Sequence, residues 1–91
     1  MIVGYSKDFD KNIDKLTDKI AKKRLEILIE KLKKADSLRE ISNVISIKNY
    51  PEIYRIRTGD YRLFVEYIDR EITILLLEYS KRNEKTYRQY K

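Results

Sequence analysis

The spacing of apolar residues differs between the two ends of this chain. Up to Ala35 apolar residues recur every three or four positions, as on one face of an α-helix, whereas beyond Pro51 they alternate with polar residues, as in a β-strand. A length of 91 residues and an apolar content of 42% are enough for one modest core. We therefore predict a single α+β domain over residues 1–91, in which a layer of helices packs on an antiparallel sheet.

The first half predicts a short strand followed by a helical hairpin. Ile2–Tyr5 is expected to form the strand, and Ser6 is a suitable N-cap for the helix that follows it. A second helix is predicted from Asp18 to Ala35, after a break near Leu16–Thr17 that lets the helices run antiparallel. The apolar stripes that define these helices are Phe9, Ile13 and Leu16, and then Ile20 or Ala21, Leu25, Leu28, Ile29 and Leu32.

The residues from Asp36 to Pro51 show no clear period. We expect a long connection with little regular structure between the helices and the strands. Its apolar side chains are expected to be buried, and they are Leu38, Ile41, Val44, Ile45 and Ile47.

The second half predicts an antiparallel meander of three strands joined by short turns. The predicted strands are Glu52–Arg57, Tyr61–Ile68 and Ile72–Ser80. Gly59 can take positive φ in the turn between the first two strands. The third strand is nearly all apolar, so we expect it to be central in the sheet and covered by the helices.

Arginines gather on this predicted sheet. Arg55 and Arg57 share one strand face, Arg62 begins the next strand, and the third strand leads into Lys81–Arg82. In a regular meander these groups converge on one patch, where crowded like charges are costly unless they meet an anion. The patch therefore predicts phosphate binding. The alternative is that each arginine pairs with a carboxylate of the same sheet, namely Glu66 or Glu78.

Net charge is +6 and the pI is near 9.5, which favours a polyanionic partner such as nucleic acid or an acidic protein. The residues after position 80 are the most basic stretch. We predict that Lys81, Lys85 and Arg88 bind RNA there, beside Tyr87, because cations meet phosphates while an aromatic ring stacks on an unpaired base. The alternative for Tyr87 is packing on the edge of the sheet.

The composition excludes several kinds of chemistry. The chain has no cysteine and no histidine, which excludes disulfides, thiol nucleophiles, Cys/His metal sites and histidine acid–base catalysis. With only two glycines, a dinucleotide site is implausible, so we expect neither a metal nor a cofactor. No signal peptide or membrane-length apolar run is visible, so we expect a cytoplasmic protein without membrane contact.

The run from Tyr54 to Leu63, the apolar strand from Ile72 to Leu77, and the Lys81–Arg82 pair with Tyr87 resemble the RelE branch of the RelE/ParE toxins. The resemblance covers nearly the whole chain, and the basic ending with Tyr87 favours RelE over the relatives that poison DNA gyrase. It implies a type II toxin that is a ribosome-dependent endoribonuclease, which cuts mRNA in the A site by attack of a ribose 2′-hydroxyl on the adjacent phosphate. It also implies a cognate antitoxin protein, the ribosome and mRNA as partners.

The resemblance assigns roles to five residues. Arg62 would brace the scissile phosphate, Arg82 would stabilise or protonate the leaving oxygen, and Tyr87 would stack on or orient the attacked nucleotide. Arg55 and Arg57 stand where some relatives have lysine. Because arginine effectively cannot lose its proton and histidine is absent, we expect catalysis to rest on charge stabilisation and in-line positioning.

Other functions are compatible with the same residues. A toxin of this fold could act on gyrase, in which case Tyr87 and the basic ending would be dispensable. A domain without catalytic activity could bind RNA or an acidic partner, in which case binding would be salt-sensitive and the transcript would stay intact.

Overall fold

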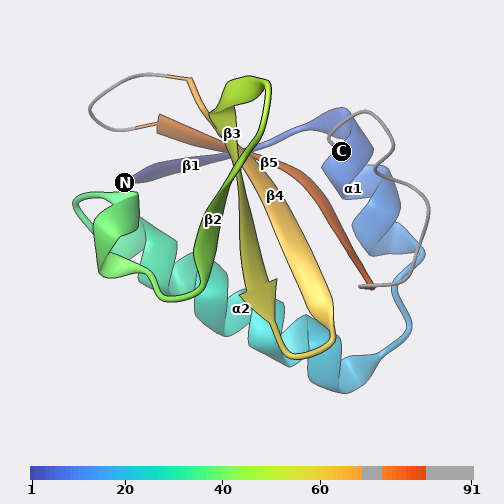
Figure 1. Cartoon of the computed structure of the whole chain (residues 1–91). Helices are drawn as coiled ribbons and strands as arrows, with labels where there is room; N and C mark the ends of the chain where they lie inside the picture. Colours follow the sequence, from blue (N-terminus) through green and yellow to red (C-terminus); the bar gives the residue numbers. More distant parts are fainter. Residues whose placement is uncertain (69–72, 82–91) are drawn as a thin grey trace.

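The computed structural model describes residues 1–68 and 73–81, and the fold is given for these residues (Figure 1). Helices and strands form two layers, so the predicted α+β architecture is confirmed. In chain order the elements are β1 (Ile2–Tyr5), α1 (Lys7–Asp14), α2 (Lys19–Lys34), the 3-10 helix η1 (Leu38–Glu40), β2 (Val44–Ile47), β3 (Tyr50–Thr58), β4 (Tyr61–Tyr67) and β5 (Thr73–Lys81).

Side-chain caps determine where both α-helices begin. The Ser6 hydroxyl accepts a hydrogen bond from the backbone N–H of Phe9 at 3.0 Å, and the Asp18 carboxylate accepts one from Ala21 at 3.0 Å. Each cap satisfies a backbone donor that has no partner within its own helix. The helices therefore start where the capping residues and the apolar stripes predict.

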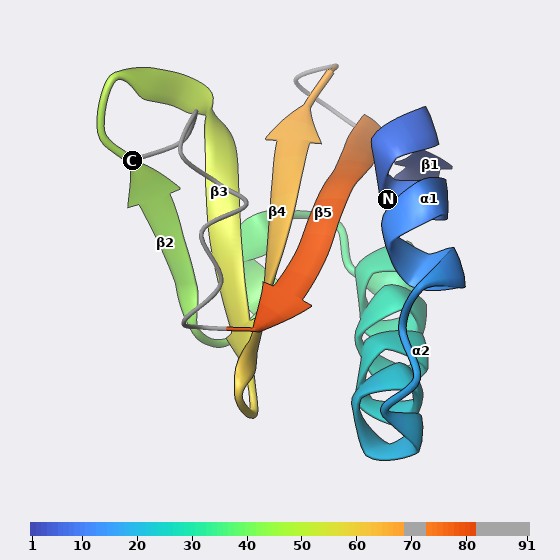
Figure 2. The same ribbon diagram turned by 90° about the vertical axis from the view of Figure 1, so that its right-hand side faces the viewer.

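The described strands form one sheet in the order β1-β5-β4-β3-β2. Neighbouring strands from β2 to β5 are antiparallel, whereas β1 runs parallel to β5. The predicted meander is confirmed as β3, β4 and β5, which lie side by side in Figure 2. The third strand is an interior strand as expected, because β1 extends the sheet beyond β5, while β2 extends it beyond β3 and β4 lies in the middle.

The expectation of little regular structure between Asp36 and Pro51 is wrong, because η1 and β2 lie there. The alternation of β2 is interrupted by a register shift at Ser46–Ile47, which hides a short edge strand from a search for period two. Asn43 and Asn49 flank β2 with φ values of 63° and 72°. Ile45 is 49% exposed, so its expected burial is also wrong.

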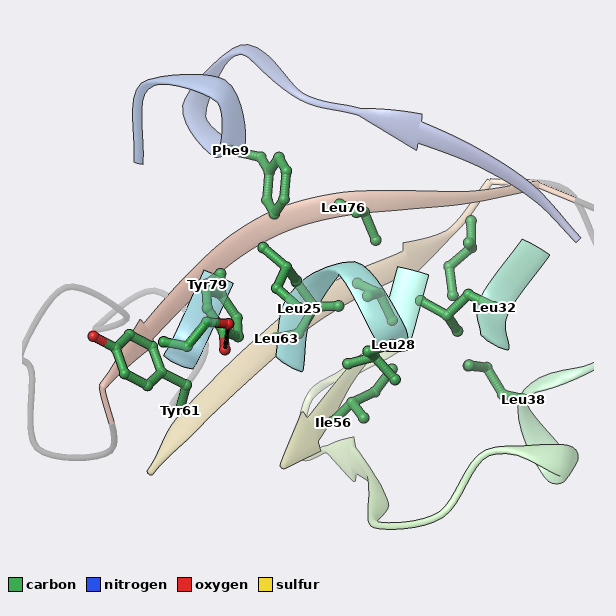
Figure 3. Close-up of a cluster of buried hydrophobic side chains, with 13 residues drawn as sticks. Phe9, Leu25, Leu28, Leu32, Leu38, Ile56, Tyr61, Leu63, Leu76 and Tyr79 are labelled. Atoms are coloured by element: carbon green, nitrogen blue, oxygen red, sulfur yellow. Dashed lines mark hydrogen bonds between the residues drawn. The ribbon is translucent and has the colours of Figure 1, made fainter. Parts of the chain in front are cut away.

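The core lies between the helices and one face of the sheet (Figure 3). Leu28 and Leu32 of α2 pack there with residues of the strands. Tyr79 is fully buried among them, stacks on Tyr61 with ring centroids 4.8 Å apart, and donates its hydroxyl hydrogen to the backbone carbonyl of Ala21 at 2.8 Å. Through this hydrogen bond, β5 is tied directly to the first turn of α2.

Tyr79 predicts how stability depends on alkaline pH. Burial, reinforced by the neighbouring Tyr61, raises the pKa of Tyr79 from 10.0 to about 12. The unfolded chain releases this proton at lower pH than the folded chain, so the free energy of unfolding should fall between pH 10 and 12, by on the order of 3 kcal/mol from this group. Tyr79→Phe removes this contribution to the pH dependence, while the lost hydrogen bond costs about 1 kcal/mol at neutral pH.

Urea denaturation of wild type and Tyr79→Phe at neutral pH and across this alkaline range measures both effects. Wild type should be more stable than Tyr79→Phe at neutral pH, and this advantage should shrink above pH 10 and reverse before pH 12, because ionisation of Tyr79 in the unfolded chain removes roughly 3 kcal/mol against the roughly 1 kcal/mol of the hydrogen bond. Tyr5→Phe, which removes an exposed hydroxyl, is the matched control. A difference that stays constant up to pH 12 would contradict the assignment.

Candidate nucleic-acid interface

The register of β3 and β4 places Arg57 directly opposite Arg62. The next pair along the ladder, Ile56 and Leu63, is buried in the core with 1% and 0% exposure. Since successive residues of a strand point to opposite faces, Arg57 and Arg62 lie on the face away from the helices, and Arg55 shares it. We call this surface the arginine face. The predicted gathering of these arginines is what the register shows.

The arginine face contains further residues that the sequence reading did not assign. Phe64 lies between Arg55 and Glu78 in the ladder, and Ser80 lies opposite Arg62. Phe64 is only 3% exposed, and the Ser80 hydroxyl donates to Glu78 Oε2 at 3.0 Å. The face is therefore a mixed surface, with a buried aromatic ring beside cationic and hydroxyl groups.

The charge arrangement on this face favours an anion. Like charges directly opposite each other in a sheet are destabilising. Within residues 1–68 and 73–81 the recorded ion pair joins Lys33 to Glu30 on α2 at 3.6 Å, and neither Arg55 nor Arg57 pairs with a carboxylate. Arg57 is exposed and Arg55 is half-buried, so both can reach a phosphate that approaches the sheet.

Lys81 is not brought together with the arginines. It pairs with Tyr61, whose ring belongs to the core, so alternation places Lys81 on the helix side of the sheet. There it lines a pocket of about 460 Å³ together with Lys11 of α1 and Lys15, the residue that follows α1. The remaining predicted site residues lie outside the described ranges, and they are Arg82, Lys85, Tyr87 and Arg88.

The turn that joins β3 to β4 determines the arginine register. Thr58 pairs with Tyr61, which leaves Gly59 and Asp60 as the connection. Gly59 has a φ of 59°, as the first residue of a two-residue type II′ turn requires. The Arg24 guanidinium of α2 lies against Gly59 where a Cβ atom would otherwise stand, so the turn is in close contact with the helix (Figure 1).

The part of the chain that the structure describes contains no group of three or more side chains suited to hold a metal ion. None of its helices is long and apolar enough to cross a membrane.

Comparison with known proteins places this geometry in context. Residues 3–84 match the family model of the ParE toxin of type II toxin–antitoxin systems, parDE. Over 67 residues the chain is 34% identical to Toxin RelE3 of Methanocaldococcus jannaschii, which covers 72% of this chain and 75% of that protein.

Solved structures show the same fold. A chain of the RelB–RelE antitoxin–toxin complex from Methanococcus jannaschii matches with a TM-score of 0.79 and 26% identity, over 97% of this chain and 99% of that one. A chain of the RelE–RelB complex from Pyrococcus horikoshii matches with a TM-score of 0.68 and 22% identity, over 91% and 96% of the two chains.

The turn generates a stability prediction. Gly59→Ala should lower the free energy of unfolding by roughly 1–2 kcal/mol, because an alanine strongly disfavours the left-handed conformation. Gly59→Asn should cost less, since asparagine tolerates positive φ, although either side chain must displace the mobile end of Arg24. Gly4→Ala is the control, because its Cβ would lie 3.4 Å from Leu75 and the backbone there has no positive φ.

Chemical denaturation of wild type, Gly59→Ala, Gly59→Asn and Gly4→Ala measures the free energy of unfolding of each protein. Equal losses for Gly59→Ala and Gly59→Asn would show that contact with Arg24, rather than φ, limits this position.

Proposed function

The chain belongs to the RelE/ParE superfamily as a RelE-type toxin of a type II toxin–antitoxin system, and we propose that it is a ribosome-dependent endoribonuclease that cuts mRNA in the A site. The observation that carries the proposal is the cross-strand Arg57–Arg62 pair, with Arg55 on the same face. A cluster of guanidinium groups that is partly open to solvent suits a phosphodiester, because each group offers several hydrogen-bond donors in a fixed geometry.

The proposed reaction is transesterification within the RNA. The ribose 2′-oxygen attacks the adjacent phosphorus, the bond to the 5′-oxygen breaks, and the products are a 2′,3′-cyclic phosphate and a 5′-hydroxyl. Arg62 is proposed to hold the scissile phosphate, and Arg55 and Arg57 to neutralise the extra charge of the pentacovalent transition state. Arg82 is proposed to stabilise the leaving oxygen, and Tyr87 to orient the attacked nucleotide.

The site chemistry accounts for the proposed dependence on the ribosome. Arginine does not release its proton near neutral pH, and the chain has no histidine to abstract the 2′-hydroxyl proton. The groups of the arginine face therefore act by charge and position, and the 2′-hydroxyl proton is relayed to the departing 5′-oxygen through the Tyr87 hydroxyl or through groups of the ribosome. Holding the mRNA in line is then a large part of catalysis, which the ribosome supplies.

We propose a cognate antitoxin as the protein partner, as in the RelB–RelE complexes that share this fold. A groove of about 640 Å³ between α2 and β1 is a suitable docking place. Its apolar part contains Tyr5, which is 45% exposed, and Ile27, which is 48% exposed. The groove is lined by the lysines Lys23, Lys31 and Lys34 and by the glutamates Glu26 and Glu30, so it suits an amphipathic segment with a small excess of acidic residues.

The second candidate target is DNA gyrase. It is favoured by the family model that matches residues 3–84, which is that of the ParE toxin of parDE. A gyrase poison would leave transcripts intact and cause DNA breaks, so an assay of mRNA cleavage separates the two targets.

Cleavage tests the proposed chemistry. In a translation extract, Arg62→Gln should reduce the rate of mRNA cleavage by about two to three orders of magnitude, because a fixed charged donor at the phosphate is lost. Primer extension on the mRNA measures the rate. Arg39→Gln, which removes an exposed arginine in η1, is the matched control and should cut like wild type.

Two results would contradict this assignment. Wild-type rates for Arg62→Gln would remove Arg62 from the site. A wild-type protein that arrests growth without cutting mRNA would favour gyrase or simple binding.

The antitoxin groove generates a separate prediction. Tyr5→Ser should weaken binding of the protein encoded by the adjacent reading frame by about tenfold or more, since buried aromatic anchors dominate interfaces. Ile2→Ser, on the same strand and 59% exposed but outside the groove, should bind like wild type. Isothermal titration of the purified proteins measures both, and circular dichroism verifies that Tyr5→Ser is folded despite its ring contact with Phe9 at 5.8 Å. Equal affinity of both variants would move the antitoxin to another surface.

A further inference from the structure

A second cationic surface lies on the opposite side of the β3–β4 hairpin from the arginine face. Here α2, the segment before β2 and the end of β3 enclose an open groove of about 790 Å³. Arg24 and Lys31 reach it from α2, and Arg57, at the end of β3, lines it as well. The Arg24 side chain bridges α2 and the hairpin turn at Gly59, and α2 forms one wall of this groove. We call it the α2–hairpin groove.

The charge of the α2–hairpin groove is unbalanced. Its lining contains the cationic residues Arg24 and Lys31 of α2 against a single acid, Glu40, whereas Arg57, which also lines it, has its side chain on the arginine face. The Glu40 carboxylate accepts a hydrogen bond from the backbone N–H of Asp36 at 2.7 Å, so one of its oxygens already has a partner that does not line the groove. Across residues 1–68 and 73–81, none of the three basic residues forms an ion pair.

The neutral residues of the groove suit a nucleotide chain. Ser42, Asn43 and Thr58 supply hydroxyl and amide groups around the opening. Leu28 and Ile56, both buried in the core, form part of the floor. A sugar–phosphate backbone can place its phosphates against the cations and its sugars over this floor.

The α2–hairpin groove adjoins the arginine face, and this favours RNA over a protein as its ligand. Arg57 stands opposite Arg62 on the arginine face and also lines the α2–hairpin groove. A strand of RNA that leaves the arginine face at this end of the hairpin therefore meets a second set of cations, those of Arg24 and Lys31.

We propose that the α2–hairpin groove is a second RNA site, which binds the phosphates of the strand that continues beyond the arginine face. The choice of RNA as its ligand rests on the proposed function, whereas the site itself does not require cleavage. Arg24 and Lys31 are its principal phosphate contacts, and Arg57 joins the two surfaces.

The test compares two double variants of the full chain with equal loss of charge. Arg24→Gln with Lys31→Gln removes the groove cations, whereas Lys23→Gln with Lys34→Gln removes two other exposed charges of α2. Fluorescence anisotropy with a labelled single-stranded RNA oligonucleotide measures the dissociation constant at several salt concentrations. The groove variant should bind about tenfold more weakly at low salt, and the slope of log affinity against log salt should decrease by about 1.4, as expected for two lost phosphate contacts.

A double variant that keeps both charges shows whether RNA affinity depends on the charge of Arg24 and Lys31 or on the shape of their side chains. Arg24 also lies against Gly59, so Arg24→Lys with Lys31→Arg changes both side chains but keeps both charges, and it should bind RNA like wild type. Equal weakening in the groove variant and in the Lys23/Lys34 control would overturn the proposal, because net charge alone would then explain the effect. Unchanged RNA affinity in the groove variant would also overturn it, whatever happens to antitoxin binding, because Lys31 lines the proposed antitoxin groove as well.

The test of the second RNA site does not depend on whether wild type cuts mRNA. If wild type does not cut mRNA but only the groove variant loses RNA affinity, the second site stands and the proposed nuclease activity fails. If wild type cuts mRNA and the groove variant keeps full RNA affinity, the second site fails and the nuclease activity stands.

Discussion

The two-residue connection at Gly59 and Asp60 is the constraint on which both faces of the sheet depend. It pairs Thr58 with Tyr61, and every later pair of β3 and β4 follows from that register. A shift of one residue would turn the apolar side chains toward solvent and the arginines into the core. The left-handed φ of 59° at Gly59 therefore supports the packing of the core and the position of the arginines at the same time.

Burial of apolar side chains in the core offsets the electrostatic repulsion between the arginines on the arginine face. Placing Arg57 opposite Arg62 is unfavourable in the absence of an anion, whereas Ile56 and Leu63, one step along the same ladder, are almost fully buried. Burial of such side chains stabilises a domain by about 1.5–3 kcal/mol each, which is enough to hold the strands in register despite the repulsion. The register thus holds these arginines on one face whether or not an anion is present, and in the proposed function such preorganisation is what charge stabilisation requires.

Most of the fold could be predicted from local patterns. Ser6 and Asp18 mark the helix starts because their side chains cap backbone donors, and alternation marks the three strands of the meander. The parallel pairing of β1 with β5 could not be predicted, because four residues contain no information about a partner some seventy positions away. β2 was missed because its bulge breaks the alternation.

Strand alternation predicts the common face of some residues of the candidate site, but it fails beyond the register shift in β5. Arg55, Arg57 and Arg62 follow from alternation and the Gly59 turn, so their common face could be expected. Lys81 could not be placed, because a register shift in β4–β5 between Phe64 and Val65 reverses the faces of the residues beyond it. The shift turns Tyr79 into the core and puts Glu78 and Ser80 on the arginine face.

The central claim is that fixed cations of the sheet promote attack of a 2′-hydroxyl on ribosome-bound mRNA. The most direct test is to determine the chemistry and position of the RNA ends that form when the protein is added to a translation reaction, with and without ribosomes. The account predicts 2′,3′-cyclic phosphate ends at A-site codons that appear only when ribosomes are present. Ends with a free 3′-hydroxyl, equal cutting without ribosomes, or intact mRNA in an arrested reaction would contradict it.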